Sequence, residues 1–200
     1  MQVFLKPSVF SFIALLWLCK PQVKVPYSNN LSIEIDGELD EIDWQKALVV
    51  QLERNNKIML IQNDDYVFIG LDNDESVLRY ADVYIANEIN EITNFHASMQ
   101  LGERKLIEGW NDTVPKWNWG NHKNWIANRL LLRGKDLEDL NESQLNNYND
   151  YEFKISKKKL ASTNLKMYIE IKDMYGVETN VCFPNDTIRY EVKDWKIVHL

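Results

Sequence analysis

Two short stretches of this 200-residue chain gather the residue types that could do chemistry. The first is IDGELDEIDW at residues 35–44, with five carboxylates, a glycine and a tryptophan. Carboxylates at this density could form the acid pair of a glycosidase or the oxygen ligands of a calcium ion. The second is WNDTVPKWNWGNHKNW at residues 110–125, with four tryptophans among polar residues. Indole rings beside amides suit a sugar, because its CH face stacks on a ring while its hydroxyls bind the amides.

A structural interpretation accounts for the whole acidic stretch and is favoured over a catalytic one. The dipeptide Asp36-Gly37 is typical of a turn, since glycine tolerates positive φ. Asp40 is suited to cap a short helical turn that follows. On that turn the apolar side chains are expected to face the core and the acids to face water: Leu39, Trp44 and Ala47 against Glu38, Glu41 and Asp43. Trp44 is then expected to close one end of a β-sandwich.

The second stretch, called the tryptophan loop below, supplies the candidate ligand-binding residues. A loop this polar is not expected to bury all four rings, and clustered exposed rings mark contact surfaces. The candidates are Trp110, Trp117, Trp119 and Trp125 for stacking, with Asn118 and Asn121 for hydrogen bonds. The alternative is that the rings pack under the loop as a small apolar cluster. Trp125 is the first candidate for a core position, because residues 125–133 are typical of a strand.

Other chemistries have weaker support in the sequence. It contains no nucleophile elbow, P-loop, dinucleotide fingerprint or zinc motif, so no enzyme activity is predicted. Its 30 acids produce pairs by chance, so their number indicates no glycosidase. No cofactor is expected, although structural calcium is possible at the oxygen-rich turns around Asp64, Asp72 and Asp82. The metal ligands stay unassigned, because no EF-hand spacing is present.

Segments with a period of two predict the strands that must position these residues. They lie at 31–35, 49–55, 57–63, 65–72, 82–87, 94–101, 125–133, 151–155, 165–171 and 188–198. Helical turns are expected at 39–48 and 156–160, and a short helix or polar loop at 136–147. Many short strands with little helix predict an all-β fold, an antiparallel sandwich or barrel.

The N-terminus is predicted to direct export. Lys6 precedes an apolar run from Val9 to Cys19, which has the length of a signal-peptide core and falls short of the roughly 20 residues of a membrane-spanning helix. Cys19 is a candidate for lipidation, as in a bacterial lipoprotein, and removal of the leader is the alternative. The expected organisation is a signal peptide or lipoprotein leader at 1–20, a tether at 21–30 and one domain at 31–200. The protein is thus expected in the cell envelope or outside the cell.

Charge narrows the range of partners. The net charge of −7 argues against nucleic acid, which requires a basic face. The sequence has no polybasic patch for a membrane surface, so membrane contact is expected only through a lipid on Cys19. Cys182 has no disulfide partner once the leader is gone, and a buried thiol is expected.

The pattern D-G-x-L-D-E-x-x-W-x-x-A at residues 36–47 resembles the opening signature of family 9 carbohydrate-binding-module-like domains, β-sandwiches related to the DOMON group. Three later segments resemble the family more loosely and in the same order: 63–74, 82–87 and 151–160. They depart from its pattern where Val67-Phe68 replaces Leu-Tyr, Tyr84 replaces an acid and Ser156 replaces proline. The resemblance implies a jelly-roll-like antiparallel β-sandwich with one or two short helices.

The resemblance also implies an exported, non-catalytic binding domain, most simply for carbohydrate, although it assigns no ligand platform in this sequence. The alternative is a structural or protein-interaction module of the bacterial cell envelope with no sugar ligand. The expected partner is therefore a glycan or an envelope protein. Haem, which some DOMON-like domains bind through Met or His, is disfavoured. His96 and Met99 are an odd number of residues apart, so one strand would point them to opposite faces, and a surface His with a core Met is expected.

Overall fold

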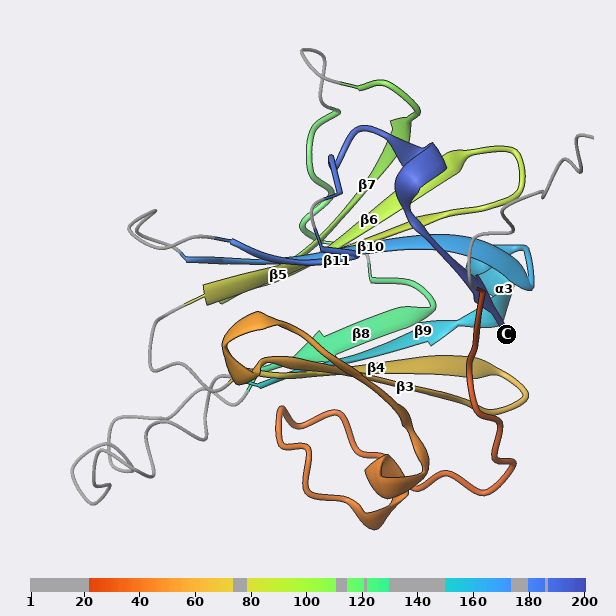
Figure 1. The fold of residues 1–200 in the computed structure, drawn as a ribbon, viewed down its shortest axis with the longest axis vertical. Coiled ribbons are helices and arrows are strands. Elements are labelled where there is room, and N and C mark those ends of the chain that lie inside the picture. Colours follow the sequence, from red (N-terminus) through yellow and green to blue (C-terminus); the bar gives the residue numbers. More distant parts are fainter. Residues whose placement is uncertain are drawn as a thin grey trace, which may run out of the picture.

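The computed structural model describes residues 22–73, 79–110, 115–120, 122–129, 150–173, 180–185 and 187–200. Two β-sheets face each other across an apolar core (Figure 1). The seven-stranded sheet has the order β1 (Val23–Lys24), β12 (Lys196–His199), β10 (Asn164–Asp173), β5 (Arg79–Ala86), β6 (Glu91–Ala97) and β7 (Leu101–Ile107), and β11 (Val181–Phe183) also pairs with β10. The five-stranded sheet has the order β2 (Leu48–Gln51), β3 (Lys57–Gln62), β4 (Tyr66–Asp72), β9 (Tyr151–Ser156) and β8 (Trp125–Asn128).

The helices within the described ranges are short and lie between strands. They are the 3-10 turns η1 (Ile42–Lys46), η2 (Glu53–Asn55) and η4 (Val192–Asp194) and the α-helical turn α3 (Lys157–Leu160). The strand pairs are antiparallel, apart from β1 and β12, which run parallel. The predicted antiparallel β-sandwich with one or two short helices is confirmed. Across the described residues, no helix has the length and apolar character needed to cross a membrane.

Alternation along each strand builds a core between the sheets and a second layer outside each sheet. On β10 the odd-numbered residues, such as Met167 and Ile169, enter the core between the sheets, while the even-numbered ones, such as Tyr168 and Glu170, face outward. Residues 31–47 cover the outer face of the five-stranded sheet (Figure 1). The C-terminal segment around η4 covers part of the other outer face.

The acidic stretch is a structural corner. Trp44 is 1% exposed and packs over Gly70 of β4, where an added Cβ would lie 3.3 Å from two atoms of the indole. The Trp44 Nε1–H donates to Oε1 of Glu152 on β9 (3.0 Å). The backbone N–H groups of Asp36 and Gly37 donate to the other oxygen of the same carboxylate (3.0 and 2.9 Å). Gly37 has φ of 97°, as a turn glycine requires. The indole points inward as predicted, but onto the outer face of a sheet and not into one end of the sandwich.

The acids of this corner were predicted to face water, but two of them accept hydrogen bonds from the backbone. Asp43 is buried and accepts from the backbone N–H of Ser32 (2.7 Å). Glu41 accepts from the backbone of Glu34 (2.7 Å) and precedes η1, a place expected for Asp40. Carboxylates were expected in water here, but a segment with no neighbouring strand needs acceptors for its N–H groups. Residues 31–35, predicted as a strand, pair with no neighbouring strand and so are not one.

The structure differs from the sequence prediction in three further segments. Residues 94–101, expected as one strand, contain the turn that separates β6 from β7, and the sequence did not indicate β7. Residues 188–191 form no strand, and η4 begins at Val192. Within the expected tether, β1 pairs with β12 and Tyr27 bridges to Gln62, so this part of the chain is joined to the fold. The predictions for Cys19, Asn121 and residues 136–147 lie outside the described residues.

Candidate functional site

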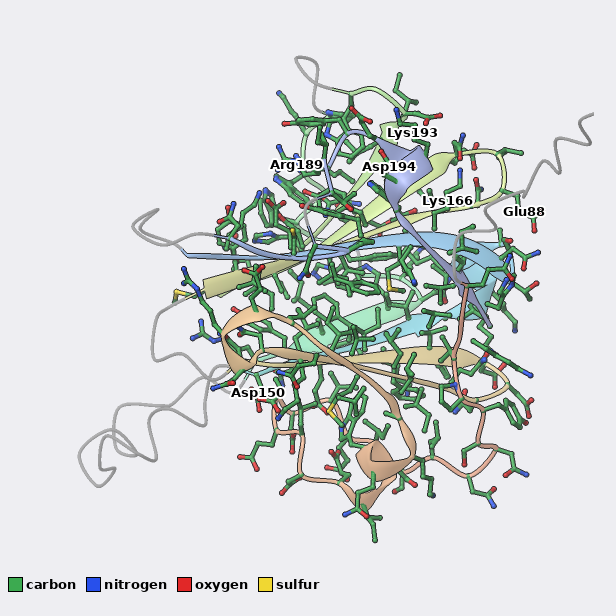
Figure 2. The ribbon with its side chains drawn as sticks, viewed as in Figure 1. Glu88, Asp150, Lys166, Arg189, Lys193 and Asp194 are labelled. Atoms are coloured by element: carbon green, nitrogen blue, oxygen red, sulfur yellow. The ribbon has the colours of Figure 1, made fainter. Side chains whose placement is uncertain are left out.

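A cavity of about 340 Å³ lies on the outer face of the seven-stranded sheet, on the side away from the five-stranded sheet. Its lining combines aromatic rings with charged groups: Tyr80, Asp82, His96, Arg104, Trp110, Trp117, Lys172 and Arg189. Figure 2 shows Arg189 on this outer side, above β10 and β11. The cavity is therefore walled by the sheet below and by covering segments at its sides.

The register of three strands, β5, β6 and β7, brings these residues together. Asp82 on β5 pairs with His96 on β6, and His96 pairs with Gly102 on β7. Asn94 pairs with Arg104 in the adjacent row. All five lie at even positions, whose side chains leave the sheet on the outer face. Residues distant in sequence thus form one continuous polar surface.

The segment 115–120 of the tryptophan loop lies beside the cavity and lines it through Trp117. It docks on the edge of β7 through two backbone hydrogen bonds between Asn118 and Glu103 (2.8 and 3.1 Å). Trp117 and Trp119 lie over Gly102, where a Cβ would stand 2.7 Å from the ring of Trp119 and 3.1 Å from that of Trp117. Only a glycine at this position lets both rings approach the strand so closely.

The two rings that lie over Gly102 differ in exposure. Trp117 is half-buried, whereas Trp119 is 44% exposed. Their centroids are 5.3 Å apart with a tilt of 37°, and both contact the ring of His96, at 5.1 and 5.6 Å. Trp119 consequently offers an open indole surface at the rim of the cavity.

His96 is held by a chain of polar contacts. Its Nδ1 lies 2.9 Å from Oδ1 of Asp82, and its Nε2 lies 3.0 Å from Oγ of Ser98. This is the order of a Ser-His-Asp relay. The Ser98 hydroxyl, however, is also bonded within its own turn, donating to the carbonyl of Gln100 (3.2 Å) and accepting from the N–H of Gln100 (3.3 Å). The contacts therefore fix the imidazole as a rigid part of the wall.

The expected surface His and core Met are reversed. The His96 side chain is 12% exposed, and Met99 is 69% exposed. The reason is the turn after β6, which carries Met99 into solvent while His96 stays on the sheet.

Three cations surround the cavity. Lys172 and Arg189 both approach Glu170, with Nζ at 2.8 Å and Nη1 at 3.5 Å from the same Oε2. Arg104 uses its Nε–H to donate to Oδ1 of Asn94 (2.8 Å), and its guanidinium lies 3.9 Å from the centre of the Trp117 ring. Burial and the charge of Asp82 raise the pKa of Tyr80, whose hydroxyl stays protonated and available as a donor.

The candidate ligand-binding residues of the tryptophan loop that the structure describes fall into two groups, those near the cavity and those in the core. Trp117 lines the cavity, Trp119 lies next to it in contact with Trp117 and His96, and Asn118 is the residue that pairs with Glu103 of β7. Trp110 is 4% exposed and stacks on Tyr84 (5.8 Å), so it contributes an edge to the cavity lining but no free ring face. Trp125 is 4% exposed, packs against Phe95 and donates from Nε1 to Glu103 (2.9 Å).

Trp110 and Trp125 are therefore core residues, a correction to their place among the stacking candidates. The loop crosses from one layer to another, and its two ends must enter the core for it to do so. The alternative of rings packed under the loop thus holds for these two tryptophans and not for Trp119.

Sequence reasoning missed the residues on the strands, chiefly Asp82, Arg104 and Lys172. A signal was present in the alternation, because charged residues occupy every outward position of 166–172 except Tyr168. A solvated sheet face explains such a pattern equally well. Only the pairing of β5, β6, β7 and β10 shows that these positions meet at one cavity.

One group of carboxylates could hold a metal ion among the described residues. Oxygens of Asp36, Glu41 and Glu152 lie within 4.8 Å of one another. Both Glu152 oxygens already accept N–H groups, and burial raises the pKa of this carboxyl to about 8, which disfavours the ionised form that calcium requires. At the turns named from the sequence, Asp72 contacts Lys57 (2.6 Å) and Asp64 accepts from Tyr27 (2.8 Å).

The two-sheet β-sandwich is similar in fold to a carbohydrate-binding module of family 9. One similar solved structure is a family 9 carbohydrate-binding module from Caldicellulosiruptor kristjanssonii in complex with cellotriose. The TM-score is 0.55 at 13% sequence identity, over 90% of this chain and 93% of that chain. The likeness confirms the predicted family 9-like fold. The sequence matches no family model and no curated protein.

Proposed function

We propose that this chain is a non-catalytic carbohydrate-binding module whose site is the cavity on the outer face of the seven-stranded sheet. The observation that carries the proposal is the Trp119 ring, which is 44% exposed beside a cavity lined with hydrogen-bonding groups. An indole face of this kind stacks on the CH surface of a sugar, and nearby polar groups fix its hydroxyls. The likeness to a module solved with cellotriose supports the same conclusion.

The size of the cavity suits a short saccharide. Ligand pockets usually measure about 300–1,000 Å³, and this one, at about 340 Å³, is near the lower limit. Trp119 would provide the platform, while Tyr80 and Lys172 at the sheet would provide hydrogen bonds. Trp117 has a supporting role, because one face of its ring carries the Arg104 guanidinium.

The test is calorimetric titration with short neutral and acidic oligosaccharides, using the Trp119→Ala variant. We expect its affinity to fall about tenfold, which corresponds to roughly 1.4 kcal/mol of lost stacking. Tyr27→Ala is the matched control, since Tyr27 is 56% exposed and lies outside the cavity lining. Equal affinity of wild type and Trp119→Ala, with both folded, would remove the cavity from consideration.

A second function is favoured by one observation. Met99 is 69% exposed on the turn before β7, close in sequence to Gly102, over which Trp119 lies, so the rim presents two large apolar groups. Such a surface suits an envelope protein as partner in place of a sugar. Recovery of one stoichiometric partner from a solubilised envelope fraction, unaffected by free sugars, would favour this function over the first.

We also propose that residues 1–20 direct export and that Cys19 accepts a lipid. The support is the apolar run that ends at this cysteine. Mass spectrometry of the N-terminal peptide from fractionated cells tests both parts, since a lipidated Cys19, a shortened unmodified chain and an intact leader differ in mass.

A further inference from the structure

The charge of the cavity differs from that of the whole protein. The chain carries a net charge of −7, yet three cations and one carboxylate line this cavity. Lys172 and Arg189 share Glu170, which offsets part of their charge. Asp82, the lining carboxylate, is bonded to His96 (2.9 Å) and receives the amide of Asn94 (3.4 Å).

Arg104 is arranged differently from the other two cations. No carboxylate within the described part of the chain forms an ion pair with it. Its Nε–H is used by Asn94 and its plane rests 3.9 Å from the centre of the Trp117 ring, so both contacts fix the orientation of the guanidinium. Neither contact uses the two terminal amino groups. A planar guanidinium held in this way presents two parallel donors, the geometry that binds a carboxylate in bidentate fashion.

We propose that the cavity selects a sugar that carries a carboxylate, a uronic acid, and that Arg104 binds the carboxylate. The inference rests on the proposed carbohydrate-binding function. The sugar ring lies against Trp119, whose indole is 44% exposed and whose centroid is 5.3 Å from that of Trp117. Asn94 and Trp117 act as positioning residues for Arg104, because they hold its guanidinium in place.

The experiment compares two matched ligand pairs by calorimetric titration. Digalacturonate is titrated against digalactose, and a glucuronate disaccharide against its carboxyl-reduced form. Wild type is expected to bind the acidic member of at least one pair at least tenfold more tightly, with a preference that weakens as ionic strength rises. Arg104→Gln is expected to lose this preference, measured as the ratio of acidic to neutral affinity, with an unchanged circular dichroism spectrum.

Controls separate the carboxylate from general charge. Lys24→Gln removes an exposed cation outside the cavity and is expected to keep the preference. Arg104→Lys keeps the charge without the planar fork and is expected to restore only part of it. Equal binding of a sulfated disaccharide would overturn the assignment of a carboxylate.

The outcomes also separate this inference from the proposed function. If wild type binds the acidic and neutral sugars equally well and Trp119→Ala binds neither, the proposed preference for uronic acids is overturned. The proposed carbohydrate-binding function would still stand. Failure of all four sugars to bind would overturn both. An acid preference that survives in Arg104→Gln would move the carboxylate site to another residue.

Discussion

Glu152 provides the sharpest test of how the corner at residues 35–44 is held. Its side chain is fully buried and accepts the N–H groups of Asp36, Gly37 and Trp44 at 2.9–3.0 Å. In Glu152→Gln the amide keeps the shape, but its NH₂ group cannot accept, so at least one buried donor loses its partner. A buried donor without a partner costs about 1–3 kcal/mol. We therefore expect the variant to be about 2 kcal/mol less stable than wild type at pH 5.

The pH dependence of this difference follows from the pKa of Glu152. Burial raises it from 4.5 to about 8, so between these values the folded protein binds a proton that the unfolded chain has released. The stability contributed by Glu152 is thus complete below pH 4.5 and is lost as pH rises toward 8. The full shift is worth roughly 5 kcal/mol, at about 1.4 kcal/mol per pH unit. Glutamine does not titrate, so the stability of wild type relative to Glu152→Gln should fall by several kcal/mol between pH 5 and 9, and the variant should become the more stable protein at the upper end.

Urea unfolding followed by tryptophan fluorescence at five pH values between 5 and 9 measures this difference. Comparison of the two proteins at each pH cancels other groups, such as Asp150, whose pKa burial raises to about 7. Trp44→Phe removes one donor and leaves the carboxyl, so it should keep the pH slope of wild type. If the difference between wild type and Glu152→Gln stays constant within 0.5 kcal/mol, Glu152 is ionised throughout and the reasoning from burial is refuted.

Two glycines beneath tryptophans yield a contrasting pair of predictions. Gly70→Ala would place a methyl group 2.7 Å from Cδ2 of Leu39 and 3.3 Å from the buried ring of Trp44, so we expect a loss of about 1–3 kcal/mol in urea unfolding; unchanged stability would show that both side chains are free to shift. Gly102→Ala would place a methyl group 2.7 Å from Trp119, whose exposed ring can swing outward, so unfolding should change by less than about 1 kcal/mol while sugar affinity falls about tenfold. A large loss of stability with intact binding in Gly102→Ala would reverse the roles given to the two rings.

The strand pattern could be predicted from sequence where alternation and length agree. The segment 65–72 corresponds to β4, and its Val67 and Ile69 lie in the core between the sheets, as a period of two requires. The segment 101–107 was missed because Glu103, Arg104 and Lys105 interrupt its apolar pattern. Glu103 has partners in other parts of the fold, Lys159 and Trp125, and Arg104 and Lys105 bond to Asn94 and Thr93 on β6; such partners are not visible in a single sequence.

The acidic corner shows a second limit of sequence reasoning. Its turn and its inward indole follow from Asp36-Gly37 and from the spacing of Trp44. The acceptor that organises them, Glu152, lies more than a hundred residues away on β9. A buried glutamate in an alternating strand looks like an ordinary solvated residue until the covering segment is known.

The location of the proposed site follows from how far the covering segments reach. Along β5 the outward positions change from Tyr84, buried against Trp110 and Trp195, to Asp82 at the cavity. The same change occurs on β10, from buried Tyr168 to Lys172. Aromatic residues are needed where the sheet is covered, and charged ones are tolerated only where the cover ends and water or a ligand can reach them. The cavity thus lies where the segments that cover the outer face of the seven-stranded sheet end, and Trp119 lies beside its opening.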